Sequence, residues 1–255
     1  MADAVIKFRD VSYRLPNGRQ ILYNVNFEVL RGEILVLLGR SGSGKTTALK
    51  LVNRLLELTD GELRVEGRLV REWDVIKLRR HIGYAIQEVG LFPHYTVERN
   101  IGLVPVIENW PREKVANRVQ ELLNLVGLNK DIASRYPHQL SGGQRQRVGV
   151  ARALAADPPI LLMDEPFGAL DPLTRADLQR EFLSLQRKLG KTVLFVTHDL
   201  REAMLLGSRI ALLEEGKLAS LSSPEGFLNS SEPLVAKYVE AFGSPFEDHT
   251  KRGCA

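Results

Sequence analysis

The chain has 255 residues, of which 44% are hydrophobic and 26% charged, and its formal net charge is +4. This composition excludes a largely disordered chain and is sufficient for one large domain or two small ones. The positive charge is modest and scattered, so it demands no nucleic-acid partner, and we expect none. The single cysteine, Cys254, excludes an intrachain disulfide and fits a reducing compartment.

The beginning of the chain and its hydropathy bear on location. Residues 1–10, MADAVIKFRD, contain no long apolar segment, so we expect no signal peptide. No apolar run approaches the roughly 20 residues that a membrane-spanning helix needs. If the protein acts at a membrane, another chain must anchor it there.

Residues 5–29 alternate well enough between apolar and polar side chains to predict strands, with a turn at Pro16-Asn17-Gly18. Tyr13, in the first part of this segment, is a candidate for stacking on an adenine ring. From these residues alone, an ordinary strand aromatic is nearly as good an interpretation.

The segment 33–47, EILVLLGRSGSGKTT, joins an apolar run to a helical pattern through a glycine-rich loop. The run 34–38 predicts a buried parallel strand, and the spacing GxxxxGK(S/T) predicts a loop that cradles polyphosphate. Glycines let backbone N–H groups turn inward, and the helix N-terminus adds partial positive charge. Lys45 would reach the β- and γ-phosphates, and the hydroxyl of Thr46 would bind Mg²⁺. The predicted nucleotide-binding residues are Gly39, Arg40, Ser41, Gly42, Ser43, Gly44, Lys45, Thr46 and Thr47.

Beyond the loop, the pattern predicts a helix that ends near Asp60-Gly61, a hairpin over 62–70, a short helix over 76–80 and a strand that ends at Gln87. At a strand end, the Gln87 amide is a candidate to complete a Mg²⁺ or water shell. Alone, this glutamine would be unremarkable.

From residue 88 to residue 158 the pattern is mostly helical, which predicts a helical subdomain of about residues 88–158 inserted into the nucleotide-binding core. The pairs Val104-Pro105 and Trp110-Pro111 are expected to interrupt its helices.

A second glycine pair opens a helix at residues 140–144, LSGGQ. Ser141 as N-cap, the two glycines and the free N–H groups of a helix start have the chemistry of an anion site. The chain already has one phosphate loop, so this surface suggests closure over a nucleotide held by another copy. The alternative is an ordinary capped helix. The residues of this motif are Ser141, Gly142, Gly143 and Gln144.

The run 160–163 predicts a buried strand that ends at two adjacent carboxylates, Asp164 and Glu165. Asp164 would hold the Mg²⁺ shell beside Thr46, and Glu165 would position the attacking water against the γ-phosphate. The alternative is a solvated acidic turn, which explains poorly why four apolar residues precede the pair.

Two further positions stand at the ends of predicted elements. Asp171, followed by a proline, predicts a helix start with Asp171 as N-cap. The buried strand predicted over 192–197 ends at His198, at the edge where ligands bind in open α/β sheets. His198 would contact the γ-phosphate and orient Glu165 or the water, whereas a lone histidine elsewhere would be interpreted as structural. Two short helices are expected over 224–242.

Together these residues resemble the ATP-binding-cassette (ABC) ATPases over residues 5 to about 220. GRSGSGKT at 39–46 is similar to the Walker A loop, ILLMDE at 160–165 to Walker B, and LSGGQ to the family signature, which is the most specific element. The resemblance implies an α/β fold: a P-loop NTPase core with an N-terminal antiparallel β subdomain and an inserted helical subdomain. We expect one such domain over residues 1–243, then a polar tail over 244–255 and no C-terminal regulatory domain.

The same resemblance implies ATP and Mg²⁺ as cofactors and a head-to-tail, ATP-dependent homodimer, in which the signature of one copy acts on the ATP of the other. Tyr13 matches the aromatic residue that stacks on adenine, and Asp171 lies in a loop at the dimer interface. The implied catalytic residues are Lys45, Glu165 and His198. The implied Mg²⁺ ligands are Thr46, Gln87 and Asp164.

A closer resemblance, carried by the runs at 86–105, 135–172 and 189–203, is to ATPase subunits of quaternary-amine importers. It implies an ATP-hydrolysing subunit that energises uptake of glycine betaine, carnitine or choline. Its direct partners would be integral-membrane permease subunits at the cytoplasmic face of the cell (inner) membrane, with a substrate-binding protein as an indirect partner. The segment from Glu88 to Asn100 is the expected docking surface.

Two departures and three alternatives accompany this interpretation. Many such subunits carry C-terminal sensing modules, and almost nothing follows Phe242 here. Ser208 replaces an aspartate expected before Arg209, which weakens the case for a local ion pair. The cargo could instead be an amino acid, a lipid or a metal chelate. A soluble ABC ATPase outside transport would need a long coiled coil or two linked cassettes. A binding module without turnover would not need all three predicted catalytic residues.

Overall fold

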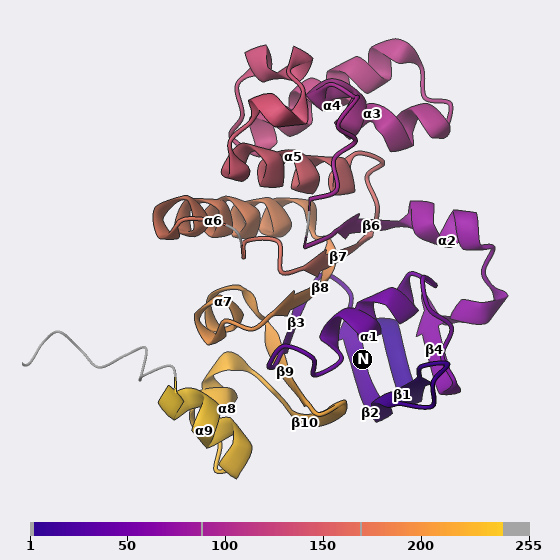
Figure 1. The fold of residues 1–255 in the computed structure, drawn as a ribbon, viewed down its shortest axis with the longest axis vertical. Helices are drawn as coiled ribbons and strands as arrows, with labels where there is room; N and C mark the ends of the chain where they lie inside the picture. The colour runs from indigo at the N-terminus through magenta and orange to yellow at the C-terminus, as the bar shows by residue number, and fades with distance from the viewer. Residues whose placement is uncertain (1–2, 88, 169, 242–255) are drawn as a thin grey trace, which may run out of the picture.

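The computed structural model describes residues 3–87, 89–168 and 170–241, which form two β-sheets and the helices around them (Figure 1). The smaller sheet is antiparallel, with the strand order β2-β1-β4-β5. β4 and β5 form the predicted hairpin around Gly67, whose φ of 75° suits glycine. The strands of this sheet are β1 Ala4–Arg14, β2 Gln20–Leu30, β4 Asp60–Val65 and β5 Arg68–Leu69.

The larger sheet has the strand order β10-β9-β3-β8-β7-β6, and all neighbours are parallel except β9 and β10. Every residue of β3, β7 and β8 is buried, as expected for central parallel strands with both faces covered. The strands are β3 Ile34–Leu38, β6 Ile82–Ala85, β7 Ile160–Asp164, β8 Thr192–Thr197, β9 Arg209–Glu214 and β10 Lys217–Ser222.

Three helices pack against the larger sheet: α1 Lys45–Val52, α6 Pro172–Leu189 and α7 Leu200–Leu206. Successive side chains of a strand point to opposite faces, so β3 contributes to two hydrophobic cores. Leu35 and Leu37 lie in one core with residues of β1, β2 and α1. The other three residues of β3 lie in the second core, with residues of α6 and α7. The loop that connects β3 to α1 is thus fixed at both ends by buried elements.

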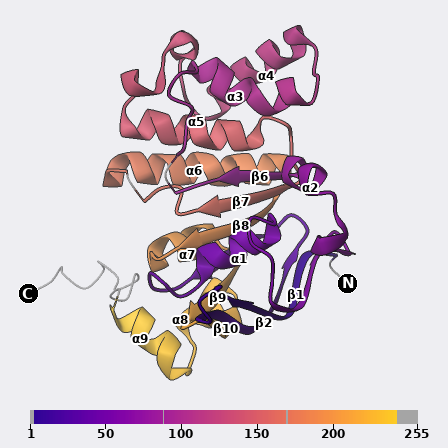
Figure 2. The ribbon, with the colours of Figure 1, turned by 45° about the vertical axis from the view of Figure 1, so that its right-hand side comes forward.

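The chain leaves the larger sheet after β6 and returns to it at the neighbouring strand β7, and the described residues between them are largely helical. The α-helices of this segment form a layer at one end of the molecule, next to α6 (Figures 1 and 2). The predicted fold class, an α/β core with an N-terminal antiparallel sheet and an inserted helical subdomain, is confirmed. The helices of this layer are α3 Val97–Ile107, α4 Arg112–Leu125 and α5 Gly142–Leu154.

Short helices complete the described part of the chain. The two expected near the C-terminal end are present as α8 and α9. None of the described helices is long and apolar enough to cross a bilayer. The remaining elements are α2 Val75–His81, α8 Pro224–Leu228, α9 Pro233–Ala241 and 3₁₀ turns at Val70–Glu72, Lys130–Ser134 and Pro137–Gln139.

The helix after the glycine loop is shorter than predicted. α1 ends at Val52 rather than near Asp60, and Arg54 has a φ of 48°, outside the helical region. The guanidinium of Arg79 in α2 donates to the carbonyl oxygens of Asn53 and Arg54, at 3.2 and 2.7 Å. These bonds satisfy carbonyl groups just past the helix end, so a tertiary contact overrides the local pattern.

The interruption predicted at Val104-Pro105 is wrong, because α3 runs through Pro105 to Ile107. Pro105 is buried within the helical subdomain, and this burial offsets the backbone hydrogen bond that proline cannot donate. Pro111, by contrast, is the N-cap residue of α4, so the break predicted at Trp110-Pro111 is confirmed.

Arg209 has an ionic partner although Ser208 stands where an aspartate was expected. Its guanidinium lies 2.6 Å from Oε1 of Glu33, and the hydrogen bond with Glu33 raises the pKa of Arg209. Ser208 accepts a hydrogen bond from the backbone N–H of Ile34, at 3.3 Å. The start of β9 is therefore bonded to the start of β3 through Arg209 and Ser208, without the expected aspartate.

Candidate nucleotide-binding site

The loop between β3 and α1 is closely packed against its surroundings. Gly42 and Gly44 have φ values of 82° and 101°, in the left-handed region that favours glycine. A Cβ atom on Gly39 would lie 2.1 Å from the carbonyl oxygen of Leu213, so no larger residue fits there. These glycines permit the tight turn into α1, where free backbone N–H groups are available to an anion.

Lys45 and Ser43 place polar groups inside this loop. Lys45 is only 4% exposed, and its Nζ donates to the carbonyl oxygens of Gly39 and Arg40, at 2.7 and 2.8 Å. Burial lowers the pKa of Lys45, and the neighbouring carboxylates oppose this shift. Ser43 is also buried, and its Oγ has no hydrogen-bond partner among the described residues. An anion in the loop would give Ser43 a partner and Lys45 an opposite charge, so both groups fit the predicted phosphate site.

Asp164 and Thr46 meet at the end of β7. The Thr46 hydroxyl donates to Oδ1 of Asp164 at 2.9 Å, and Asp164 is 3% exposed. Burial raises the pKa of Asp164, whereas the bond from Thr46 lowers it. A hydroxyl and one carboxylate fit a Mg²⁺ ion that takes its other ligands from phosphate and water.

Tyr84 is part of this site and was missed in the sequence. Burial, followed by the charge of the neighbouring Asp164 carboxylate, raises the pKa of Tyr84. Tyr84 lies in β6, next to β7, and its place beside Asp164 follows only from the order of the strands.

Glu165 is the centre of a cluster of three side chains, which we call the Glu165 cluster. Its Oε2 accepts a hydrogen bond from Nε2 of Gln87 at 3.2 Å and lies 3.0 Å from Nδ1 of His198. Glu165 has a φ of 45°, and its backbone N–H donates to Val196 at 3.0 Å. A left-handed backbone at a non-glycine residue costs on the order of 1–3 kcal/mol and is found mainly at functional sites. The three strand-end residues that we predicted separately are therefore in contact.

The remaining predicted residues occupy different surroundings. Arg40, Ser41 and Gly42 are exposed, and Thr46 and Thr47 are half-buried. The loop thus has an open outer rim and a closed inner end.

Tyr13 is buried, with 8% of its surface exposed, in the core beneath the smaller sheet. It presents little surface to an adenine ring. Its stacking role stays a prediction, and its burial weighs against it.

Asp171 is the N-cap of α6, as predicted, and its Oδ1 accepts from the backbone N–H of Thr174 at 3.1 Å. Hydrogen bonding with the side chain and the backbone of Thr174 lowers the pKa of Asp171. Its place at a dimer interface stays a prediction.

The LSGGQ motif opens α5 in the helical subdomain. Ser141 is the N-cap, as predicted: its Oγ accepts from the N–H of Gln144 at 3.2 Å, and Oε1 of Gln144 accepts from the N–H of Ser141 at 3.0 Å. Ser141 and Gly142 are exposed. No hydrogen bond or ion pair within the described ranges joins residues 141–144 to the loop at 39–47.

Comparison with known proteins identifies this arrangement. The family model described as ABC transporter matches residues 22–168, more than half of the chain. The chain belongs to the ABC transporter family. The dimeric, post-hydrolysis structure of the ATP-binding cassette MJ0796, bound to ADP and Pi, matches this ABC protein with a TM-score of 0.79 and 34% identity, over 86% of this chain and 98% of that one.

Two curated relatives of this ABC protein are ATP-binding proteins of transport or uptake. The glycine betaine/carnitine/choline transport ATP-binding protein OpuCA of Bacillus subtilis (strain 168) is 47% identical over 236 residues, which cover 92% of this chain and 62% of that protein. The glycine betaine uptake system ATP-binding protein YehX of Escherichia coli (strain K12) is 49% identical over 220 residues, 86% of this chain and 71% of that protein. The chain therefore spans about three fifths of the length of the first of these relatives. The predicted family is confirmed, and so is the predicted similarity to ATP-binding proteins of quaternary-amine transport.

Proposed function

We propose that this ABC protein is the ATP-hydrolysing subunit of an importer for a quaternary amine osmoprotectant such as glycine betaine, carnitine or choline. The Glu165 cluster carries the proposal: a carboxylate held by two polar side chains stands beside a phosphate loop with a buried lysine. A carboxylate whose position is fixed by neighbouring side chains suits a reaction that must orient a water molecule. A pure binding module would not require such a carboxylate.

The roles of the side chains follow from their positions. Lys45 would exchange its bonds to two backbone carbonyl oxygens for bonds to the β- and γ-phosphates. Thr46 and Asp164 would hold Mg²⁺, which when bound neutralises charge on those phosphates. Glu165 would accept a hydrogen bond from the attacking water. His198, with Nδ1 at Glu165, can direct its other ring nitrogen to a γ-phosphate oxygen.

Replacing Glu165 by glutamine tests the catalytic assignment. The amide keeps the size of the side chain but loses the charge that orients the water, so turnover should fall at least about 100-fold while ATP still binds. Phosphate release at saturating MgATP measures the first effect, and light scattering with and without ATP measures the accumulation of dimers. The matched control is Glu121→Gln, at an exposed position on α4. Unchanged phosphate release in Glu165→Gln would remove Glu165 from the mechanism.

We also propose the head-to-tail homodimer. The support is that residues 141–144 form a capped helix start, exposed at Ser141 and Gly142, without bonds to the phosphate loop of their own chain. An exposed anion-binding surface of this kind is available to a nucleotide on a second copy. The cassette MJ0796 is dimeric in its ADP and Pi complex, which agrees with this arrangement.

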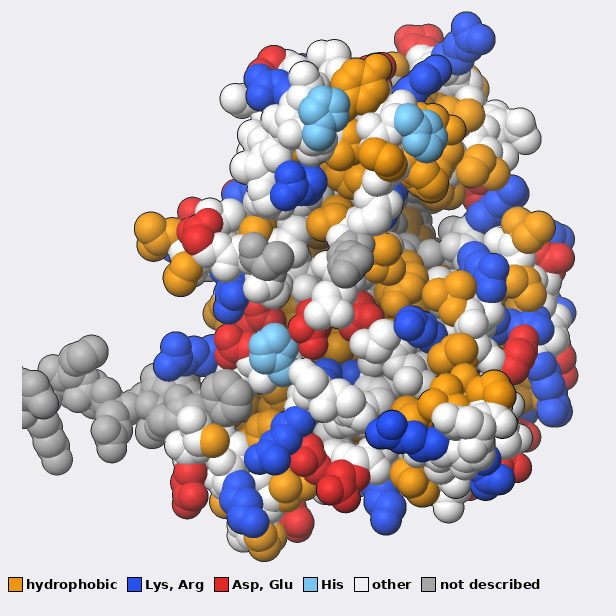
Figure 3. Space-filling model, in the orientation of Figure 1, with side chains coloured by type: hydrophobic (Ala, Val, Ile, Leu, Met, Phe, Trp, Pro, Cys, Tyr) orange, Lys and Arg blue, Asp and Glu red, His pale blue; other side chains and the backbone are white. Residues whose placement is uncertain are grey.

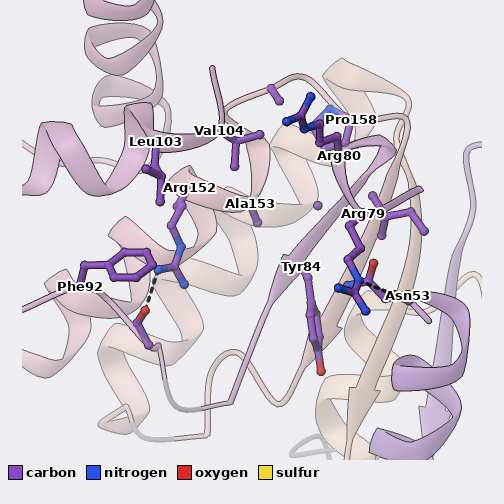
Figure 4. Close-up of a pocket in the computed structure, with 14 residues that line it drawn as sticks. Asn53, Arg79, Arg80, Tyr84, Phe92, Leu103, Val104, Arg152, Ala153 and Pro158 are labelled. Atoms are coloured by element: carbon purple, nitrogen blue, oxygen red, sulfur yellow. Dashed lines mark hydrogen bonds between the residues drawn. The ribbon is translucent and has the colours of Figure 1, made fainter. Parts of the chain in front are cut away.

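A groove of about 350 Å³ between the helical subdomain and the core is our proposed docking site for permease subunits. Phe92, Leu103 and Val104 line it on the side of the helical subdomain, and Arg79 and Tyr84 line it on the side of the core (Figure 4). In space-filling view the molecule is hollowed below the helical subdomain, where hydrophobic side chains gather (Figure 3). Apolar walls with basic groups suit a short segment of a membrane protein.

The groove coincides with part of the segment from Glu88 to Asn100 that we predicted for docking. Gly90 and Phe92 line it, and Phe92 is 40% exposed. Glu88 lies outside the described residues. Through this contact the protein would sit at the cytoplasmic face of the cell membrane, held by its permease and served indirectly by a substrate-binding protein.

The proposed cargo follows from the names of the relatives and is tested by transport. Purification of the chain from solubilised membranes, followed by mass spectrometry, would identify its permease. Vesicles containing that complex and ATP should accumulate radiolabelled glycine betaine, carnitine or choline, and vesicles with the Lys45→Ala variant should not. Accumulation of amino acids or metal chelates instead would contradict the cargo and leave the ATPase role intact.

A further inference from the structure

One face of α9, which includes Leu234, Lys237, Tyr238 and Ala241, lies beside the phosphate loop. Tyr238 is 6% exposed, and its hydroxyl donates to Oε2 of Glu214 at 3.0 Å. A cavity of about 290 Å³ between α9, the loop and His198 is lined by Tyr238 and Lys237 on one side and by Arg40 and Ser41 on the other. α9 is thus one wall of the space beside the candidate nucleotide site.

Glu214 connects α9 to the loop, because it is the last residue of β9 and β9 is in contact with the loop at several points. The carbonyl oxygen of Leu213 fills the space beside Gly39. After the turn, the backbone N–H of Gly216 donates to the carbonyl oxygen of Ser43 at 3.1 Å. Oε1 of Glu214 lies 3.9 Å from Nε of Arg40.

We infer that Tyr238 is a positioning residue for the phosphate loop, acting through Glu214 and the end of β9. The inference rests on the proposed function, because it assigns the loop to ATP. Without the Tyr238 hydroxyl, only the exposed Arg40 side chain, 3.9 Å away, would keep the half-buried Glu214 carboxylate from turning toward Lys45. In that position the carboxylate would repel the phosphates. The Tyr238 hydroxyl holds this carboxylate toward α9. The end of β9 then keeps Gly39 and Ser43 in place through the contacts of Leu213 and Gly216.

The chemistry of the pair suits a fixed donor. Burial, followed by the bond to Glu214, raises the pKa of Tyr238 to about 12, and backbone hydrogen bonding from Arg40 opposes the shift. The phenol therefore stays protonated throughout the physiological pH range and always donates. Replacing it by phenylalanine removes one hydroxyl and preserves the buried ring, so packing of α9 is retained.

The test compares Tyr238→Phe with the unsubstituted chain and with Tyr23→Phe, a matched removal of one hydroxyl at a half-exposed site. In steady-state ATPase assays, Tyr238→Phe should raise the KM for MgATP about three- to tenfold, the effect of one net hydrogen bond, with kcat within about twofold. Titration with a fluorescent ATP analogue should show the same loss of affinity. A purely structural role would instead lower the melting temperature and the active fraction, and so kcat, with KM unchanged.

A second variant separates the charge of Glu214 from its hydrogen bond. Glu214→Gln keeps an oxygen that accepts from Tyr238 and removes the negative charge, so its KM should equal that of the unsubstituted chain or be lower. Adding Tyr238→Phe to Glu214→Gln should then raise KM less than Tyr238→Phe does alone, because no charge remains to turn toward the phosphates. An unchanged KM in Tyr238→Phe, or equal effects of Tyr238→Phe in both backgrounds, overturns the inference alone. Failure of the unsubstituted chain to bind MgATP overturns the proposed function and this inference with it.

Discussion

At the scale of single residues, Asp164 is a buried carboxylate at the proposed Mg²⁺ site, and its burial lowers the stability of the fold. Burial raises its pKa above the ordinary 3.8, so near pH 4 the folded chain binds more protons than the unfolded chain. The contribution of Asp164 to the free energy of unfolding therefore rises as the pH falls toward 3.8. At neutral pH the charged Asp164 lowers that free energy. Residues kept for chemistry often carry such a cost.

Replacing Asp164 by asparagine should therefore stabilise the free protein and abolish Mg²⁺-dependent turnover. The amide oxygen still accepts from Thr46, while the buried charge is gone. We expect the melting temperature at pH 7 to rise by roughly 2–4 °C, about 1 kcal/mol for a chain of this size. Calorimetry at pH 7 and at pH 5 measures the difference, which should narrow at the lower pH. A variant less stable than the unsubstituted chain at pH 7 would show that Asp164 is favourable as an anion even without Mg²⁺.

The residues that were predictable from the sequence share a simple property. Lys45 stands where the glycine loop meets α1, and Asp164 and His198 stand at the ends of buried strands, so local patterning located them. Tyr84 and Tyr238 reach the site from β6 and α9, and only the tertiary arrangement brings them there. Tyr13 shows the opposite case: it lies in a strand as predicted, but its side chain is buried in the core.

At the scale of elements, α5 is joined to the segment that follows Gln87. Arg152 in α5 donates to the carbonyl oxygens of Val89 and Gly90, both at 2.7 Å, and burial lowers the pKa of Arg152. Gly149 of the same helix is in close contact with Val89, where a Cβ would lie 2.6 Å from the valine side chain. The signature helix and the segment that lines the groove should therefore move together.

Arg152→Met should weaken this connection. It leaves two carbonyl groups without their donor, which lowers the free energy of unfolding by about 1–3 kcal/mol. In the assembled importer, we expect the unstimulated ATPase rate to persist while the increase in rate caused by the permease and cargo falls. Arg180→Met is the control, since Arg180 is exposed and pairs only with Asp177 among the described residues. Equal stimulation in the two variants would show that Arg152 is not part of the coupling.

At the scale of the whole molecule, the phosphate loop and the signature belong to different parts of the chain. The loop lies between β3 and α1 in the core, and the signature opens α5 in the helical layer (Figure 1). The order of motifs in the sequence was predictable, because each has a local pattern. Their separation in space was expected from the inserted helical subdomain, whereas the place where that segment leaves the sheet, between β6 and β7, follows only from the strand order. A symmetric pair of chains would bring each loop to a signature of the other copy, with both contacts related by a two-fold axis.

A mixture of two inactive variants tests this pairing. Lys45→Ala removes the phosphate ligand and keeps the signature, whereas Ser141→Arg blocks the signature and keeps the loop. Each homodimer should be inactive, because each of its sites lacks one half. A mixed dimer should contain one complete site and one site defective on both sides. Random pairing in a 1:1 mixture makes about half of the dimers mixed, and each mixed dimer has one working site of the two that its two-fold symmetry provides. If the sites are independent, we expect about a quarter of the rate of the unsubstituted chain. Phosphate release measured before and after mixing gives the result, and separate melting curves establish that each variant is folded. No recovery from two folded variants would contradict shared sites, and activity of Ser141→Arg alone would show that one chain completes the site by itself.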